Sequence, residues 1–257
     1  MCAPRRVTAI VVGLGVLMGL MTGRATADTI IVNQVSDFPV SGRVGLWGSQ
    51  NDTHSPGGLG NFATTYDNFV APVTSTLTSA QWTGGYFNAA IPGTTPIPGN
   101  ITAFTLTFYG DAGGKPDTTH PPLAIESILG NAKEQFVGME LGTGLPMASI
   151  FSYSTPLPTP FTLQAGTPYW LSIVADLDFS DNTNGLQWGW HTASNGLNDG
   201  LNVFQGPSPL DSPAGNLAFT LQGNLAAVPE PSSLVLFALG ALCLAGGRSW
   251  RKRAAAR

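Results

Sequence analysis

The stretch ITAFTLTFYGD, from Ile101 to Asp111, decides the fold class of this chain. Large apolar residues alternate with threonine along it, and the side chains of an extended strand point alternately to the two faces of a sheet. One face therefore carries Phe104, Leu106 and Phe108. A period of two residues that ends in glycine and aspartate predicts a half-buried β-strand followed by a turn.

The same pattern recurs along the chain. It is clearest in TPYWLSIVAD (167–176) and NLAFTLQG (216–223), and further strands are predicted over Thr29–Asn33, Tyr66–Val70, Ala80–Phe87, Glu134–Leu141, Ile150–Tyr153 and Leu186–Thr192. The segment Leu123–Phe136 comes nearest to a helical period, and a short helix is the alternative there. About nine short strands joined by loops predict an all-β fold, an antiparallel β-sandwich of jelly-roll-like type.

Charge and cysteine content divide the chain into a body and two ends. The body, 28–227, has 14 acidic and three basic residues and a net charge of −11. Such a surface disfavours nucleic acid, because binding phosphates requires lysine and arginine. Both cysteines, Cys2 and Cys243, lie outside the body, which therefore has no disulfide and no thiolate metal site.

The N-terminal end, 1–27, is typical of a secretory signal peptide. Two arginines at positions 5 and 6 precede the apolar stretch Val7–Met21, and Ala25-Thr26-Ala27 supplies the small residues of a cleavage site. We expect cleavage before Asp28. An uncleaved membrane anchor is the alternative.

The C-terminal end, 228–257, has three parts in order. Val228 and the triplet Pro229-Glu230-Pro231 are followed by an uncharged run over 232–247, which at 16 residues is slightly short for a membrane-spanning helix. A basic tail over 248–257 contains Arg248, Arg251, Lys252 and Arg253. By the positive-inside rule this tail stays cytoplasmic while the body is exported.

These C-terminal residues resemble the PEP-CTERM sorting domain of exported bacterial proteins. The resemblance implies that an exosortase, a membrane-embedded transpeptidase, cleaves near Pro229-Glu230-Pro231 and transfers the body to the cell surface or extracellular matrix. The chain would be the substrate of that enzyme. The alternative is an ordinary membrane helix behind a chance triplet. The body is similar to the uncharacterised β-rich ectodomains that precede such signals, which implies nothing about its chemistry.

No catalytic motif is present in the body. The histidines His54, His120 and His191 stand about 70 residues apart, without glutamate or histidine at metal-ligand spacing. Paired carboxylates among the three body glutamates, Glu126, Glu134 and Glu140, would be needed for a glycosidase, but their spacing carries no signature. We therefore expect an exported protein that is not an enzyme.

Two groups of residues are candidate binding sites. Trp82, Trp170, Trp188 and Trp190 lie on predicted strands, where indole rings either fill the core or form an exposed platform for sugar rings. The platform would make the body a carbohydrate-binding module for extracellular polysaccharide. Asp176, Asp178 and Asp181 either bind calcium or form an acidic turn without an ion. No other cofactor is predicted.

Overall fold

The structure, a computed structural model, describes residues 28–40, 43–52, 63–87, 101–140, 148–177, 187–204 and 212–226. All regular elements in these ranges are strands, and they form two sheets of seven strands each. The fold is therefore all-β and consistent with the predicted β-sandwich. The predicted signal peptide, sorting motif, transmembrane helix and basic tail lie outside the described residues. Within them, no helix is long and apolar enough to cross a membrane.

The first sheet is built around one long strand, β5. Its members are β1 (Thr29–Gln34), β2 (Leu46–Gly48), β5 (Ser75–Phe87), β8 (Gln135–Glu140), β9 (Ala148–Leu163), β11 (Gln187–His191) and β14 (Phe219–Leu225). On one edge β5 pairs with β9, which in turn pairs with β8. The other edge is shared by β14, with β1 beyond it, and β11, with β2 beyond it.

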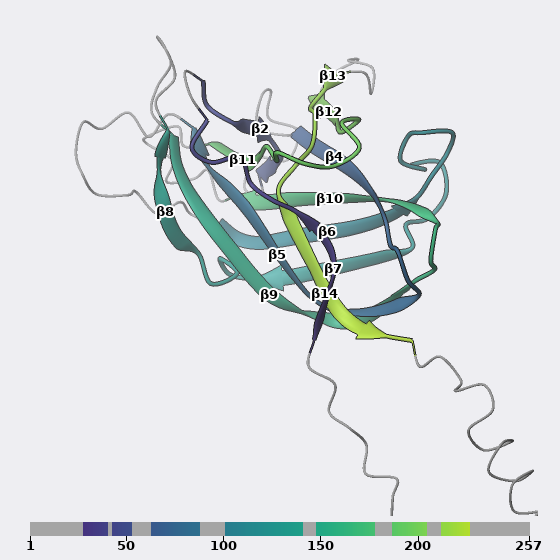
Figure 1. Cartoon of the computed structure of the whole chain (residues 1–257). Helices are drawn as coiled ribbons and strands as arrows, with labels where there is room; N and C mark the ends of the chain where they lie inside the picture. The colour runs from purple at the N-terminus through teal and green to yellow at the C-terminus, as the bar shows by residue number, and fades with distance from the viewer. Residues whose placement is uncertain are drawn as a thin grey trace, which may run out of the picture.

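The second sheet is built around β10. Its members are β3 (Gln50–Asp52), β4 (Ala63–Val70), β6 (Ile101–Gly110), β7 (Ala124–Leu129), β10 (Pro168–Leu177), β12 (Leu201–Phe204) and β13 (Ser212–Pro213). β6 and then β7 lie on one side of β10, and β4 and β3 share its other side. In Figure 1, β6, β7 and β10 run across the view behind the sloping strands β5, β9 and β14. Among the described strands, all pairs except β3 with β10 are antiparallel.

The core lies between the sheets and contains the opening stretch of the sequence. This stretch is β6, which pairs with β10 along almost its whole length. Phe104, Leu106 and Phe108 are all 0% exposed, as their alternation predicts. The ring of Phe104 packs edge-on against Trp82 at 4.9 Å and Trp188 at 5.2 Å, both from the opposite sheet.

Two predictions about individual elements need correction. The segment Leu123–Phe136 holds no helix: it forms β7, a turn and the start of β8. In β7 buried Glu126 and Ile128 alternate with exposed residues, which is a strand period, and Ala132 and Lys133 at positive φ then reverse the chain. An apolar pattern this short fits both the helical period and the strand period, so it does not distinguish a helix from a strand.

Strand β9 runs far beyond the predicted Ile150–Tyr153. Its second half contains prolines at positions 156, 158 and 160, which cannot donate to a ladder. The strand continues because the pairing with β5 jumps from Pro156 opposite Ser79 to Phe161 opposite Leu77, so that the intervening residues bulge out of register. The short strands β2, β3, β12 and β13 carry no sequence period and were not predicted.

We expect the segment 28–227 to fold alone as a monomeric β-protein whose stability does not depend on reductant, because it contains no cysteine. Far-ultraviolet circular dichroism, sedimentation and urea unfolding with and without dithiothreitol test this. A helical spectrum would contradict the fold. A change in the urea midpoint when dithiothreitol is added would contradict the prediction that packing alone, without a disulfide, stabilises the segment.

Candidate functional site

The four tryptophans of the predicted platform are core residues. Trp170, Trp188 and Trp190 are 0% exposed and Trp82 is 2% exposed. Trp188 and Trp190 alternate on β11 and share a face, as predicted, but that face is the inside of the sandwich. A ring without exposed surface cannot stack on a sugar, so these four residues do not form an exposed platform.

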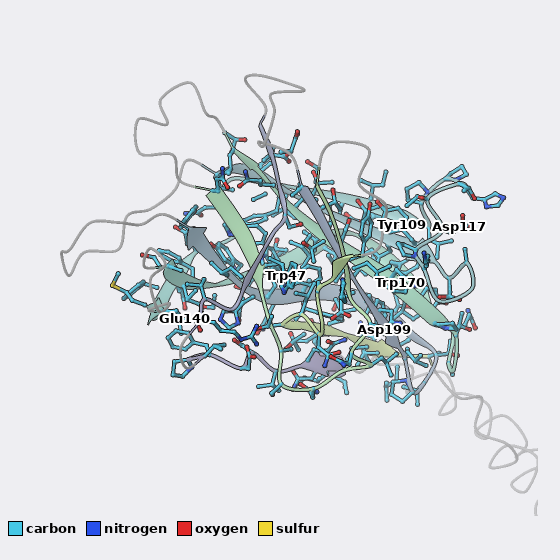
Figure 2. All side chains as sticks on the ribbon, turned by 90° about the horizontal axis from the view of Figure 1, so that it is seen from above. Trp47, Tyr109, Asp117, Glu140, Trp170 and Asp199 are labelled. Atoms are coloured by element: carbon cyan, nitrogen blue, oxygen red, sulfur yellow. The ribbon has the colours of Figure 1, made fainter. Side chains whose placement is uncertain are left out.

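The indole nitrogens show how three of these rings are fixed. Trp188 Nε1 donates to the hydroxyl of Tyr153 at 3.0 Å, and Trp190 Nε1 donates to the Ala218 carbonyl at 2.9 Å. Trp170 lies on the other face of β10, beside Tyr109 of β6, as Figure 2 shows, and its Nε1 donates to Asp111 Oδ1 at 2.8 Å. These bonds hold the rings in place and leave them no polar group for a ligand.

The three glutamates of the body do not pair with one another. Glu126 is buried and accepts a hydrogen bond from the Thr159 N–H at 3.2 Å. Glu134 accepts from the hydroxyls of Tyr86, at 2.6 Å, and Tyr153. Burial raises the pKa of Glu134, although these two hydrogen bonds oppose the increase. Glu140 has a third, separate environment, so these three glutamates form no carboxylate pair with one another.

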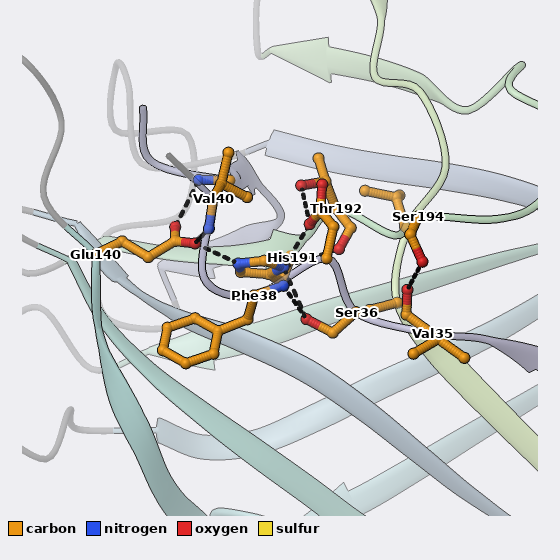
Figure 3. Close-up of polar contacts among 12 residues, drawn as sticks. Val35, Ser36, Phe38, Val40, Glu140, His191, Thr192 and Ser194 are labelled. Atoms are coloured by element: carbon orange, nitrogen blue, oxygen red, sulfur yellow. Dashed lines mark hydrogen bonds and ion pairs between the residues drawn. The ribbon is translucent and has the colours of Figure 1, made fainter. Parts of the chain in front are cut away.

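Glu140 and His191 form an enclosed polar cluster among the described residues. Glu140 ends β8 and His191 ends β11, and Figure 3 shows both beside Ser36, Phe38 and Val40. His191 Nε2 lies 3.1 Å from Glu140 Oε1, and both residues are almost fully buried. The N–H groups of Val40 and Gly45 each donate to Glu140 at 2.7 Å. The Glu140 carboxylate, at the end of β8, is thus hydrogen-bonded to Val40, Gly45 and His191, all of which are far from β8 in the sequence.

The other side of His191 faces oxygen atoms as well. Its Nδ1 lies 2.8 Å from the Thr192 carbonyl oxygen, 3.1 Å from Ser36 Oγ and 3.4 Å from Asp37 Oδ1. Nδ1 donates to the Thr192 carbonyl when it carries a hydrogen and accepts from the Ser36 hydroxyl when it does not. In both cases groups of the protein itself hold the ring on both sides.

Gly45 is required by this arrangement. A Cβ atom at this position would lie 2.8 Å from Thr192 Oγ1 and 3.0 Å from His191 Nε2. A side chain there would displace Thr192 or Val40 and press on the histidine. The cluster fastens residues 36–40 and 43–45 to β8 and β11, and we call it the lock.

The pKa of Glu140 follows from the same contacts. Burial alone would raise it, but the hydrogen bonds from His191, Gly45 and Val40 outweigh burial and hold the pKa below its ordinary value. Glu140 and His191 are 51 positions apart in the sequence, and no motif or spacing connects them. The only local signal is a glutamate at the end of an alternating strand.

A second buried carboxylate, Asp67, lies on the inner face of β4. It is 0% exposed and accepts hydrogen bonds from the N–H groups of Leu217, at 2.7 Å, and Asn68, at 2.9 Å. Burial raises its pKa to about 8, and the charge of Asp199 adds to the increase, while the two N–H groups oppose it. Asp67 fastens the segment before β14 to the second sheet.

The calcium prediction falls mostly outside the described residues. Asp178 and Asp181 are not described, whereas Asp176 lies near the end of β10. Its two carboxylate oxygens accept hydrogen bonds from Asn51 Nδ2 and Thr105 Oγ1, at 3.1 and 3.0 Å. The described ranges contain no group of three or more acidic, histidine or cysteine side chains that could hold a metal ion. Calcium binding stays a prediction.

We predict that Glu140→Gln destabilises the protein at pH 7 by about 1–3 kcal/mol, because the amide group turns a donor toward the N–H of Val40 or Gly45. A carboxyl whose pKa is lowered by folding adds stability above its unfolded pKa of about 4.3, and that stability is lost as the pH falls through the folded pKa. The difference between the variant and the wild type should therefore shrink in acid. Urea unfolding between pH 3 and pH 7 measures this.

Glu134→Gln is the matched control for this experiment. Because burial raises the pKa of Glu134, removing its charge should cost less at pH 7 than removing the charge of Glu140. Equal losses for both variants at every pH would contradict the lock.

Comparison with known proteins gives two matches along this chain. A family model described as a domain of unknown function, DUF7901, matches residues 46–212, from β2 to the start of β13. The model of the PEP-CTERM protein-sorting motif matches residues 227–253, which confirms the predicted resemblance at the C-terminal end. No curated protein and no solved structure matches the chain.

Proposed function

Since the chain belongs to the DUF7901 family and carries a PEP-CTERM sorting motif, we propose that it is a non-enzymatic surface or matrix protein. The observation that carries the proposal is the match at 227–253, because this motif implies exosortase-dependent sorting of an extracellular protein. The signal peptide over 1–27 starts export, and the apolar run 232–247 holds the chain in the membrane until an exosortase-type transpeptidase processes it.

The end of the folded body supports this order of events. β14 ends at Leu225, which is 52% exposed, and the sorting motif begins within a few residues of that point. Two prolines disfavour a helix at themselves and at the residues before them, so the triplet 229–231 favours an extended peptide. An extended peptide just outside a folded domain is a suitable substrate for a protease.

The environment of the polar residues supports a non-enzymatic body. Glu140, Asp67 and His191 are buried and paired with groups of the protein itself, so each has a role in holding the fold. A catalytic acid or base must instead reach its substrate. We therefore infer that these groups stabilise the body and do no chemistry on a ligand.

Polysaccharide binding is a second candidate function, which a polar hollow of about 180 Å³ favours. It lies across β1, β5, β9 and β14, and the hydroxyl and amide groups at its surface come from Asn33, Gln81, Thr83, Ser152 and Thr220. Its size suits a single sugar unit. Binding of the 28–227 segment to a glycan array, and its loss in Gln81→Ala, would support it.

We predict that replacing Pro229, Glu230 and Pro231 with alanine leaves export intact but retains the protein in the membrane with its tail attached. The measurement is membrane fractionation of a chain with an epitope tag after Arg257, in a host that has an exosortase. Ser232→Ala with Ser233→Ala, next to the motif, is the control and should lose the tag normally. If the triple variant loses its tag as fast as the wild type, sorting through this motif is wrong.

A further inference from the structure

Both ends of the folded body lie at the same end of the sandwich. β1 and β14 are antiparallel neighbours, with Thr29 opposite Gly223, so the first strand starts beside the point where the last strand ends, as Figure 1 shows. The turn over 70–74 joins them there, because the Ala226 N–H donates to the Thr74 carbonyl at 2.9 Å. The turn over 163–168 is attached in turn, since the Gly166 N–H donates to the Ala71 carbonyl at 2.9 Å. We name this the terminal end.

Large apolar side chains are exposed on the terminal end. Val70 and Val73, in and beside the first turn, are 40% and 43% exposed, and Leu225 is 52% exposed. Leu123 is 50% exposed and borders a hollow of about 470 Å³. The hollow is otherwise lined mainly by the beginning of β10 and the end of β9, including Phe161, Pro168 and Tyr169. The four exposed side chains and this hollow form the apolar patch.

The apolar patch carries little charge in a strongly acidic body, with Asp111 as the acidic residue that lines its hollow. The segments 70–74, 121–123, 161–168 and 225–226 contain no aspartate, glutamate, lysine or arginine, whereas the body as a whole carries a net charge of −11. The nearest acidic side chain at the hollow is Asp111, which accepts the hydrogen bond of Trp170 Nε1. An acidic surface is repelled by anionic lipid, so the low charge of these segments reduces the electrostatic cost of approaching a bilayer, which exposed Asp28, next to the start of β1, opposes.

The chain itself brings this end to the membrane. Five residues, 227–231, separate the body from the apolar run, and five extended residues reach at most about 18 Å. This is well under the length of the long strands β5 and β9, which run from the terminal end to the opposite end. While the apolar run is in the membrane, the opposite end therefore cannot replace the terminal end there. We propose that the apolar patch rests on the lipid surface during this stage. The inference depends on the proposed function, because it requires the C-terminal segment to anchor the chain.

Contact with lipid would fix the position of the cleavage site. A body that rests on the bilayer through Val73 and Leu225 keeps the peptide 227–231 at the membrane surface, where a membrane-embedded transpeptidase acts. It also directs the opposite ends of β5, β8 and β11 away from the membrane.

Quenching by lipid tests the proposal on the full chain. A fluorophore is attached at Val73→Cys or at Val137→Cys, with Cys2 and Cys243 replaced by serine, and the protein is reconstituted into anionic vesicles that contain brominated lipid. Val137 is a matched control, because it is 46% exposed but lies on β8, which pairs with the end of β9 farthest from the terminal end. We expect bromine to quench the label at 73 and to leave the label at 137 unchanged.

A second variant tests the patch itself. Val73→Asp with Leu225→Asp changes only exposed side chains, so the fold should persist, and a label at Leu123→Cys should lose its quenching while the protein still floats with the vesicles. Equal quenching at 73 and 137, or continued quenching at 123 in the aspartate variant, overturns the proposal. Self-quenching of the label at 73 that increases with protein density on the vesicles and does not depend on bromine would show that the patch joins two copies of the chain. That result also overturns the proposal.

Flotation separates this failure from failure of the proposed function. If the wild-type chain floats but its label at 73 is not quenched, only the lipid contact is wrong. If the chain does not float at all, anchoring by the C-terminal segment is wrong and the lipid contact is excluded with it.

Discussion

The packing of Phe104 against the aromatic residues of the opposite sheet is the contact on which the sandwich depends. Trp82 and Tyr153 stack at 5.6 Å with nearly parallel rings, and Phe104 meets both of them edge-on. These residues come from β5, β9 and β6, so a single cluster joins the centres of the two sheets. Since the body has no cysteine, this packing has no covalent support. Gly84 is part of the same constraint, because a Cβ there would lie 2.3 Å from the Trp188 ring.

Buried carboxylates hold segments that lie outside the aromatic core. Segments without strand pairing cross the edges of the sandwich, and their backbone N–H groups need acceptors. Glu140 and Asp67 supply these acceptors, the first for Val40 and Gly45 and the second for Leu217. An ionised group in such a place is costly unless it is fully hydrogen-bonded. The lock of His191 and Glu140 meets this condition, because the carboxylate is hydrogen-bonded to Val40, Gly45 and His191.

The path of the chain keeps the sorting motif apart from the folded body. Antiparallel pairing of the first and last strands places both ends of the body together, and the sorting motif follows directly from there. The C-terminal sorting motif therefore begins at one end of the sandwich, directly after the last strand.

The sequence by itself determined the sorting motif at the C-terminal end, the all-β class and which residues of a strand share a face. These properties are local: a period of two residues assigns Phe104 and Trp188 to a face, and the order of motif, apolar run and basic tail specifies sorting. Only the tertiary structure decided that Trp188 faces inward, that β9 passes three prolines through a bulge, and that His191 meets Glu140 across 51 positions. Periodicity defines faces but not partners, because pairing depends on which distant strands reach each other and bury their apolar sides together.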